Sequence, residues 1–369
     1  MDCLEDGVPK TCIGVLQGDN GNLQLSQNVP VPEVLPGWLL VRTAVISLSP
    51  CDFKMPKLLP SPGLKGGLDF AGTVVARGQG VEHFQLGDRV LGAVVGNKTD
   101  DPESGAFSQY VRIESVFALK IPENVSLEAS IAWIPSYIFT AALALHQGLG
   151  LPDVLRARIH NESEEAKNGN RETVLVHGGS SCVGLMTLQM LKIHGFHVIT
   201  TCSEKNSSLV KLYGADAVFD YHDQDCARAI REYTKDRLRY VIDPFGEPGG
   251  TAMCVAALGR RGGIYCCLEQ YHADLVSSRR TVKHCLIMGP AVSGRGVELP
   301  EPYGVSPDAK LESWATSFCY PGVQKLLDSG SLRPVPVRIL EGGWGAVIHG
   351  LELLEGKGVS GQKLIVLVE

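Results

Sequence analysis

The chain has 369 residues, a formal net charge of −6 at pH 7, and 44% hydrophobic residues. At about 150 residues per domain, this length allows two to three domains with sizeable cores. The acidic balance and the lack of a basic run disfavour nucleic acid as a partner. No apolar leader opens the chain and no run of about 18 apolar residues occurs, so we expect a cytoplasmic protein without a membrane span.

The 11 cysteines are scattered without repeated C-x-x-C spacing. This pattern indicates reduced thiols rather than a disulfide framework. Cys266 and Cys267 fall within an expected buried strand, where small apolar core residues are the simpler interpretation.

The first 136 residues predict a β-rich domain. Short apolar segments alternate with turn residues there, and strands are expected at residues 38–48, 69–77, 88–95 and 107–113.

A glycine-rich turn after residue 172 is the most informative stretch. An apolar strand beginning at Thr173 runs into residues 177–184 (HGGSSCVG) and then into an apolar helix over residues 185–194. A dinucleotide pyrophosphate binds at such a turn, because small residues let the backbone approach the phosphates and helix N–H groups point at them. In a G-x-G-x-x-G alignment the positions are Gly179, Ser181 and Gly184, with serine at the middle glycine. An ordinary strand-to-helix turn fits the same pattern.

Strands and helices alternate after this turn. Further strands are expected at residues 196–202, 217–221, 239–243, 263–268 and 284–288, with helices near 207–213, 224–234 and 250–258. This alternation predicts an α/β fold with a doubly wound parallel sheet over residues 137–314. The charged segment 156–172 lacks a packing face and is interpreted as a polar insertion. Residues 315–369 predict short strands and one helix that rejoin the first domain.

Four segments resemble the medium-chain dehydrogenase/reductase superfamily: residues 67–76 (GLDFAGTVVA), 84–92 (FQLGDRVLG), 105–110 (GAFSQY) and 358–366 (GVSGQKLIV). The resemblance covers nearly the whole chain. It implies a GroES-like catalytic domain, an inserted Rossmann domain and a return to the catalytic domain. Residues 50–55 (PCDFKM), 200–203 (TTCS), 219–221 (FDY), 287–290 (IMGP) and 302–304 (PYG) are most similar to the trans-acting enoyl reductases of fungal polyketide synthases, of the lovastatin-pathway type.

The zinc positions of the superfamily are vacant here. Zinc needs cysteine or histidine donors in a tetrahedral set. Where the zinc-dependent members carry cysteine this chain has Ser49, and where they carry Gly-His-Glu it has Gly67, Leu68 and Asp69. Residues 95–110 also lack the four cysteines of the structural zinc lobe. We therefore predict an enzyme without a metal.

The resemblance also supplies catalytic candidates. Lys54 lies in the segment that resembles the loop facing the nicotinamide, with an ordinary surface lysine as the alternative. Tyr137 and Thr140 lie where family members place a residue against the nicotinamide carboxamide, although Thr140 also fits a simple helix-end residue. Asp52 is expected to bond the backbone of its own turn.

The cofactor candidates are read from the expected loops. The phosphate turn supplies Gly179, Ser180, Ser181, Cys182 and Val183. Where NAD enzymes carry an acidic residue after the second Rossmann strand, this chain has Ser203, followed by Lys205 and Asn206, with Lys211 and Tyr221 further along. Donors and positive charge predominate, which favours NADPH unless Glu204 points inward. Gly289 completes the candidate set.

We therefore expect an NADPH-dependent enoyl reductase that, as the resemblance implies, reduces an α,β-unsaturated thioester on the carrier domain of a polyketide synthase or synthase–peptide synthetase hybrid. A zinc-free NADPH quinone or enone oxidoreductase is one alternative, since it would share the same site. A catalytically silent NADPH-binding scaffold is the other, because Ser181 replaces a turn glycine.

The last strand of the expected Rossmann domain indicates the oligomeric state. Pro290 cannot donate a hydrogen bond along a sheet edge, so pairing there is disfavoured and a monomer is expected. Docking of an acidic carrier domain would need local cations, with an ordinary solvated face as the alternative. The candidates are Lys54, Lys57, Lys65, Arg279, Arg280, Lys283 and Arg295.

Overall fold

The computed structural model describes residues 7–151, 155, 172–356 and 358–369. The chain divides into two compact units: Met1–Ser136 with Gln324–Glu369 form unit one, and Tyr137–Val323 form unit two. Residues 315–323, which the sequence pattern assigned to the returning segment, thus belong to unit two. Residues 156–171 of the expected polar insertion lie outside the described residues.

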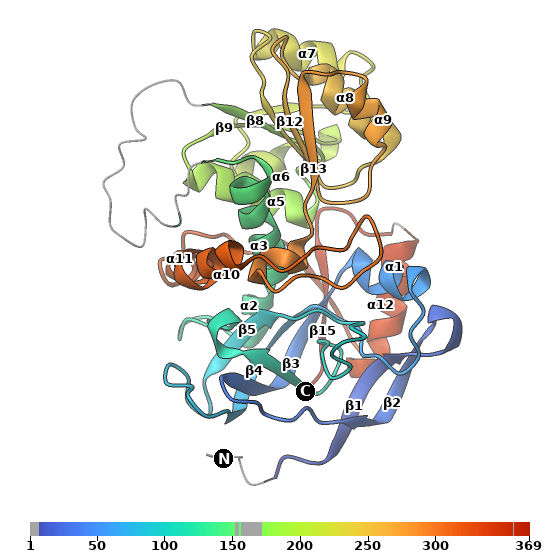
Figure 1. The fold of residues 1–369 in the computed structure, drawn as a ribbon, viewed down its shortest axis with the longest axis vertical. Coiled ribbons are helices and arrows are strands. Elements are labelled where there is room, and N and C mark those ends of the chain that lie inside the picture. Colours follow the sequence, from blue (N-terminus) through green and yellow to red (C-terminus); the bar gives the residue numbers. More distant parts are fainter. Residues whose placement is uncertain (1–6, 152–154, 156–171, 357) are drawn as a thin grey trace. The chain divides into compact units, whose positions relative to one another are not determined.

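Unit one is built on a seven-stranded sheet and a separate hairpin (Figure 1). The path through the sheet is β14-β15-β3-β4-β5-β7, and β6 pairs with β3. The strands are β3 (Trp38–Leu48), β4 (Asp69–Arg77), β5 (Arg89–Ala93), β6 (Tyr110–Glu114), β7 (Leu119–Lys120), β14 (Val337–Leu340) and β15 (Lys363–Leu367), and the hairpin joins β1 (Thr11–Gln17) to β2 (Leu23–Pro30). The β-rich first domain is confirmed.

The central strand of unit one is β3, which pairs with β4, β6 and β15. Its Val, Ile and Leu residues suit a strand covered on both faces, and nine of its 11 residues are buried. The helices of this unit are α1 (Pro50–Leu58), α2 (Leu127–Ser130) and α12 (Ala346–Glu355). Helices α1 and α12 pack against each other.

Unit two contains a six-stranded parallel sheet in the order β10-β9-β8-β11-β12-β13. The strands are β8 (Thr173–Val176), β9 (His197–Thr201), β10 (Ala217–Phe219), β11 (Tyr240–Asp243), β12 (Gly263–Cys267) and β13 (Val282–Leu286). Numbered along the chain, this order is the 3-2-1-4-5-6 of a doubly wound dinucleotide-binding sheet. The expected Rossmann architecture is confirmed.

The helices that connect these strands are α5 (Cys182–Ile193), α6 (Ser207–Leu212), α7 (Cys226–Tyr233), α8 (Pro248–Ala257) and α9 (Ala273–Ser277), and α10 (Ala309–Trp314) and α11 (Tyr320–Asp328) follow the sheet. The sequence pattern did not predict α10 or the β1–β2 hairpin. Strand β2 is rich in Gln, Ser and Asn, and β1 (TCIGVLQ) lacks a clear apolar alternation.

Helix α3 (Pro135–Leu143) continues through a π-helical turn at Ala144–Gly148 and carries the chain from unit one into unit two. The helical stretch Leu127–Gly148, which includes α2, is long and apolar enough to cross a membrane by length and composition. However, 72% of its most apolar window is buried inside the protein, as is usual for a core helix.

Candidate active site

The turn between β8 and α5 has the geometry expected of a phosphate-binding turn. Gly178 adopts φ +63°, and a Cβ there would lie 2.2 Å from the ring of Phe245, so only glycine fits. Ser181 is the N-cap of α5: its Oγ accepts a hydrogen bond from the Gly184 N–H at 3.1 Å. A Cβ on Gly184 would lie 2.7 Å from the Gly178 carbonyl oxygen, so the helix can approach the turn only with glycine at this position.

Ser181 at the middle-glycine position therefore has a structural role. Its φ of −69° needs no glycine, and its hydroxyl donates to the Gly178 carbonyl at 2.9 Å while it caps the helix. The first turn of α5, with Cys182 and Val183, presents backbone N–H groups that have no partner within the helix. The serine thus fits the turn without disturbing the N-terminus of α5.

Two residues beside the turn were not among the sequence candidates. His177 is 8% exposed and its Nδ1 lies 2.7 Å from Thr201 Oγ1, which also accepts from the Gly178 N–H at 3.1 Å. Burial lowers the pKa of His177, so its imidazole is neutral at pH 7. A Cβ on Gly179 would lie 2.1 Å from Thr200 Oγ1, so the turn also needs glycine where it packs against β9. The contacts of His177 and Thr201 could not be predicted from the sequence, because neither residue belongs to the glycine motif.

Exposed aromatic rings flank this end of the sheet. Tyr221 is 44% exposed and Phe245 is 43% exposed, and each meets the His177 ring edge-on, with centroids 6.2 and 6.1 Å apart. Large exposed rings around a buried imidazole form an apolar surface suited to a planar ring. Tyr221 was a sequence candidate, whereas Phe245 lies beyond β11 in a segment that carries no motif.

The loop after β9 holds the expected ribose-side residues. Ser203 directly precedes a single helical turn over Glu204–Asn206, and Asn206 Nδ2 donates to Ser203 Oγ at 3.3 Å. Lys205 and Glu204 are exposed. Asp220 lies close by, because its carboxylate accepts from the Glu204 backbone N–H, and hydrogen bonds from His222 lower its pKa. A carboxylate that the sequence analysis did not weigh is thus present beside the donors.

Thr140 and Gly289 meet within unit two. A Cβ on Gly289 would lie 2.1 Å from Thr140 Oγ1, so glycine is required where the chain leaves β13 and passes α3. Tyr137 is three residues before Thr140 on α3, which places both side chains on one helix face, and both are partly buried. The structure therefore brings three of the sequence candidates to one place.

Lys54 lies on α1 in unit one and is exposed. Helix α1 begins at a capping box, in which the Asp52 carboxylate accepts from the Ser49 backbone N–H at 2.7 Å. The expectation that Asp52 bonds its own turn is confirmed. Asp52 is fully buried, and burial raises its pKa to about 7.

A buried ionic cluster lies behind α1. Lys363, at the start of β15, is 3% exposed, and its Nζ donates to Ser49 Oγ at 2.5 Å. Its positive charge acts on the carboxyl groups of Asp52 and Asp69 and opposes the rise in pKa that burial causes in both. The same burial raises the pKa of the Cys51 thiol. These buried charges stabilise one another, since an unpaired buried charge is strongly destabilising.

Asp69 connects this cluster to α3. Its carboxylate accepts hydrogen bonds from the backbone N–H and the hydroxyl of Ser136, both at 2.7 Å, and from the Ser47 hydroxyl at 3.2 Å. A carboxylate at a helix N-terminus is favoured by the helix dipole. Asp69 therefore holds the first turn of the helix that carries Tyr137 and Thr140.

The donor set at these positions does not fit zinc. Ser49 offers a hydroxyl, Leu68 offers no donor, and the Lys363 ammonium bonded to Ser49 would repel a second cation. Among the described residues, no group of three His, Cys, Asp or Glu side chains is placed to hold a metal ion.

Among the seven cations expected to dock a carrier domain, Lys65 is buried, and Arg279, Lys57 and Arg295 have hydrogen-bond or ion-pair partners. Lys65 is 2% exposed, which removes it from any docking surface. Arg279 donates to the carbonyls of Val255, at 2.9 Å, and Leu258, at 2.8 Å, at the end of α8. The sequence alone predicts neither the burial of Lys65 nor the hydrogen bonds from Arg279 to these carbonyls.

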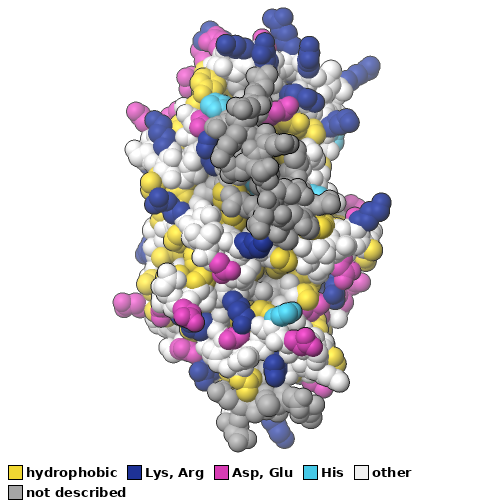
Figure 2. All heavy atoms as spheres, turned by 90° about the vertical axis from the view of Figure 1, so that its left-hand side faces the viewer, with side chains coloured by type: hydrophobic (Ala, Val, Ile, Leu, Met, Phe, Trp, Pro, Cys, Tyr) yellow, Lys and Arg dark blue, Asp and Glu magenta, His cyan; other side chains and the backbone are white. Residues whose placement is uncertain are grey.

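Two further candidate cations form ion pairs. Lys57 pairs with Glu355, and Arg295 lies 3.2 Å from Glu312. On the face drawn in Figure 2, basic and acidic side chains stand next to each other. Arg280 and Lys283 are exposed, as is Lys54.

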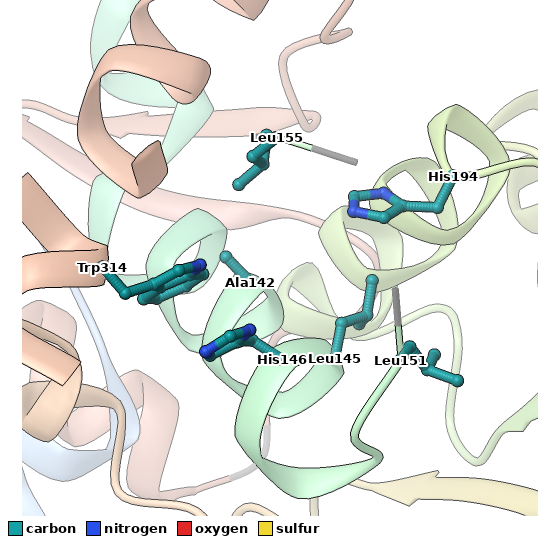
Figure 3. Close-up of a pocket in the computed structure, with 7 residues that line it drawn as sticks. All are labelled: Ala142, Leu145, His146, Leu151, Leu155, His194 and Trp314. Atoms are coloured by element: carbon teal, nitrogen blue, oxygen red, sulfur yellow. The ribbon is translucent and has the colours of Figure 1, made fainter. Parts of the chain in front are cut away.

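A small hollow in unit two lies apart from all these candidates (Figure 3). In it, the His146 ring stacks on Trp314 with centroids 4.1 Å apart, and His194 lies opposite, with its Nδ1 2.6 Å from the Met190 carbonyl oxygen. The lining residues are Ala142, Leu145, His146, Leu151, Leu155, His194 and Trp314. None of the sequence candidates lines it.

Comparison with known proteins agrees with this geometry. The family model for the alcohol dehydrogenase GroES-like domain matches residues 35–123, and that for zinc-binding dehydrogenases matches residues 182–291. The chain is 41% identical to the trans-enoyl reductase ccsC of Aspergillus clavatus, over 96% of this chain and 95% of the relative. It is 40% identical to the trans-enoyl reductase RAP2 of Pyricularia oryzae, over 98% and 99%.

A solved structure shares the fold. The quinone oxidoreductase from Coxiella burnetii superposes with a TM-score of 0.69 at 23% identity, covering 97% of this chain and 99% of that one.

Proposed function

Because this chain belongs to the trans-enoyl reductases of the medium-chain dehydrogenase/reductase superfamily, we propose that it reduces an α,β-unsaturated thioester carried by a polyketide synthase. The observation that carries the proposal is the 41% identity to a trans-enoyl reductase over 96% of the chain. The thioester would arrive on the phosphopantetheine arm of a carrier domain, in a polyketide synthase or a synthase–peptide synthetase hybrid.

A conjugated thioester can be reduced without a Lewis acid. A bound nicotinamide supplies a hydride to the β-carbon, and the α-carbon then takes a proton. The developing enolate needs a positive charge or hydrogen-bond donors. We assign electrostatic support of the thioester to Lys54 and contact with the nicotinamide to Tyr137 and Thr140.

The proposed cofactor is NADPH. The phosphate turn with the N-terminus of α5 would hold the pyrophosphate, and Tyr221 with Phe245 would flank the adenine. Ser203, Lys205 and Asn206 would hold the 2′-phosphate. Asp220 opposes this preference, because a carboxylate repels a phosphate, so Lys205 is expected to supply the decisive charge.

Lys205→Glu tests the cofactor assignment. The variant should raise the KM for NADPH by about tenfold or more and leave the KM for NADH within about twofold, because only NADPH carries the 2′-phosphate. Lys283→Glu is the matched control, since Lys283 lies on β13, at the opposite edge of the sheet from β10. An NADH preference in the unaltered enzyme would reject the assignment.

We further propose that the enzyme works without zinc, as a monomer and in the cytoplasm. Metal analysis of purified, dialysed protein should find no tightly bound zinc, and one zinc per chain would overturn the first point. Sedimentation should give a mass near 39.7 kDa. Twice that mass would overturn the second.

A substrate panel tests the reaction. NADPH oxidation should be fast with a crotonyl pantetheine thioester and slow with small quinones. Rapid turnover of quinones alone would instead indicate a quinone oxidoreductase. Tight NADPH binding with no turnover of any substrate would indicate a nucleotide-binding scaffold.

A further inference from the structure

Two cysteines stand directly opposite each other in the sheet of unit two. Cys266 on β12 and Cys285 on β13 are register partners in this parallel pair. Adjacent strands lie about 4.8 Å apart, which falls within the range of Cα separations of about 4.4–6.8 Å that a disulfide bridges. The backbone therefore already holds the two residues at bonding range.

Both thiols converge on Gly148, at the end of the π-helical turn that follows α3. A Cβ placed on Gly148 would lie 2.5 Å from Cys266 Sγ, and Cys285 Sγ donates to the Gly148 carbonyl oxygen at 3.5 Å. The two side chains thus share one face of the sheet, and glycine at 148 makes room for them.

The two thiols differ in their environments. Cys266 is fully buried, whereas Cys285 is partly exposed on β13, the outer strand of the sheet. Contact between the two thiols lowers the pKa of Cys285 and raises that of Cys266, which burial raises further. The more accessible cysteine is therefore also the one whose pKa is lowered, and the thiolate is the reactive form of a cysteine.

We propose that Cys266 and Cys285 form a dithiol that hydrogen peroxide converts reversibly to a disulfide. The Cys285 thiolate attacks one peroxide oxygen, the O–O bond breaks, and Cys285 sulfenic acid and hydroxide form. The Cys266 sulfur then attacks the Cys285 sulfur, the S–O bond breaks, and water leaves with the proton of Cys266. Overall, two thiols and one peroxide give one disulfide and two waters.

The position of the pair connects it to the candidate active site. Strand β13 ends at Leu286, and three residues later Gly289 packs against Thr140. A covalent bond between β12 and β13 fixes the strand that delivers Gly289. Because a thiol supplied in excess attacks the bond again, the oxidised state is expected to return to the dithiol with a reducing dithiol reagent.

Peptide mapping tests the pair without any mutation. Cleavage after Arg261, Arg279, Lys283 and Arg295 places Cys266 in the peptide 262–279 and Cys285 in the peptide 284–295. After mild peroxide treatment of the full-length protein, mass spectrometry should find these two peptides joined, with the loss of two hydrogens. The joined species should disappear after reduction. Absence of this species, with Cys285 free or oxidised to sulfinic acid, would overturn the proposal.

Variants assign the partner, because the peptide 262–279 also contains Cys267. Cys267→Ser is the matched control: the side chain of Cys267 points to the opposite face of β12, so the crosslink should persist. Cys266→Ala should abolish it and make Cys285 sulfenic acid trappable with dimedone at several times the unaltered level. A crosslink that survives in Cys266→Ala and is lost in Cys267→Ser would also overturn the proposal.

Discussion

Lys54 shares its helix with a second lysine, and this makes a matched test of its role. Both Lys54 and Lys57 are exposed on α1, but Lys57 pairs with Glu355 on α12. Lys54→Met should lower kcat with the pantetheine thioester by about 10²-fold, because a charge that supports the developing enolate is lost. The KM for NADPH should change little. Lys57→Met should retain full kcat, and equal losses in both variants would remove Lys54 from the catalytic set.

Asp52 should make unit one less stable as the pH rises. Burial raises its pKa in the folded protein to about 7, from its ordinary value of 3.8. At a pH between these two pKa values, Asp52 is protonated in the folded protein and ionised in the unfolded chain. Stability therefore falls as pH rises from about 4 to about 7, by at most about 4 kcal/mol.

Thermal unfolding of the Asp52→Asn variant tests this loss of stability with rising pH. Between pH 4.5 and pH 8, the unfolding midpoint of the unaltered protein should fall by several degrees relative to that of the variant, because the amide does not titrate. Asp19→Asn, at an exposed residue of the same unit, should follow the unaltered protein. A constant difference between the Asp52→Asn variant and the unaltered protein across this range would contradict the account.

At the scale of elements, the turn between β8 and α5 depends on how closely the helix approaches it. Gly184→Ala places a Cβ 2.7 Å from the Gly178 carbonyl oxygen, so the helix or the turn must shift. We expect NADPH to bind about tenfold more weakly, measured by fluorescence titration. Gly249→Ala in the first turn of α8 is the control, since nothing lies within 4 Å of its added Cβ. Equal affinities for both variants would argue against this turn as the phosphate site.

The same turn shows how much of the candidate site could be predicted from the sequence. The glycine motif located the turn between β8 and α5, because strand, small residues and apolar helix follow one another in the chain. Serine in place of the middle glycine also left a catalytically silent scaffold as an alternative, and in the folded turn the Ser181 hydroxyl caps α5. Lys65 and Arg279 appeared as surface charges, since only tertiary packing buries the first and brings helix carbonyls to the second. The sequence did not indicate His177 or Phe245, because only long-range contacts bring them next to the turn.

At the scale of the whole molecule, docking of a carrier domain depends on the cations that remain on the surface. If Arg280 and Lys283 contact an acidic carrier, raising salt from about 50 to about 500 mM should slow turnover of the carrier-bound substrate much more than that of the pantetheine mimic. Reversal of both charges to Glu should reproduce this difference. Arg228→Glu with Lys235→Glu, on and just after α7, should not. Equal salt sensitivity of the two substrates would leave the patch without a role.

The central claim is hydride transfer to the β-carbon of a conjugated thioester by an enzyme without a metal. The most direct measurement uses NADPH labelled with deuterium at the transferring position and a crotonyl pantetheine thioester, with enzyme dialysed against a chelator. The product should be the saturated thioester with one deuterium at its β-carbon, and unlabelled NADPH in D₂O should place deuterium at the α-carbon instead. An unreduced thioester, or label from the cofactor at any other carbon, would contradict the account.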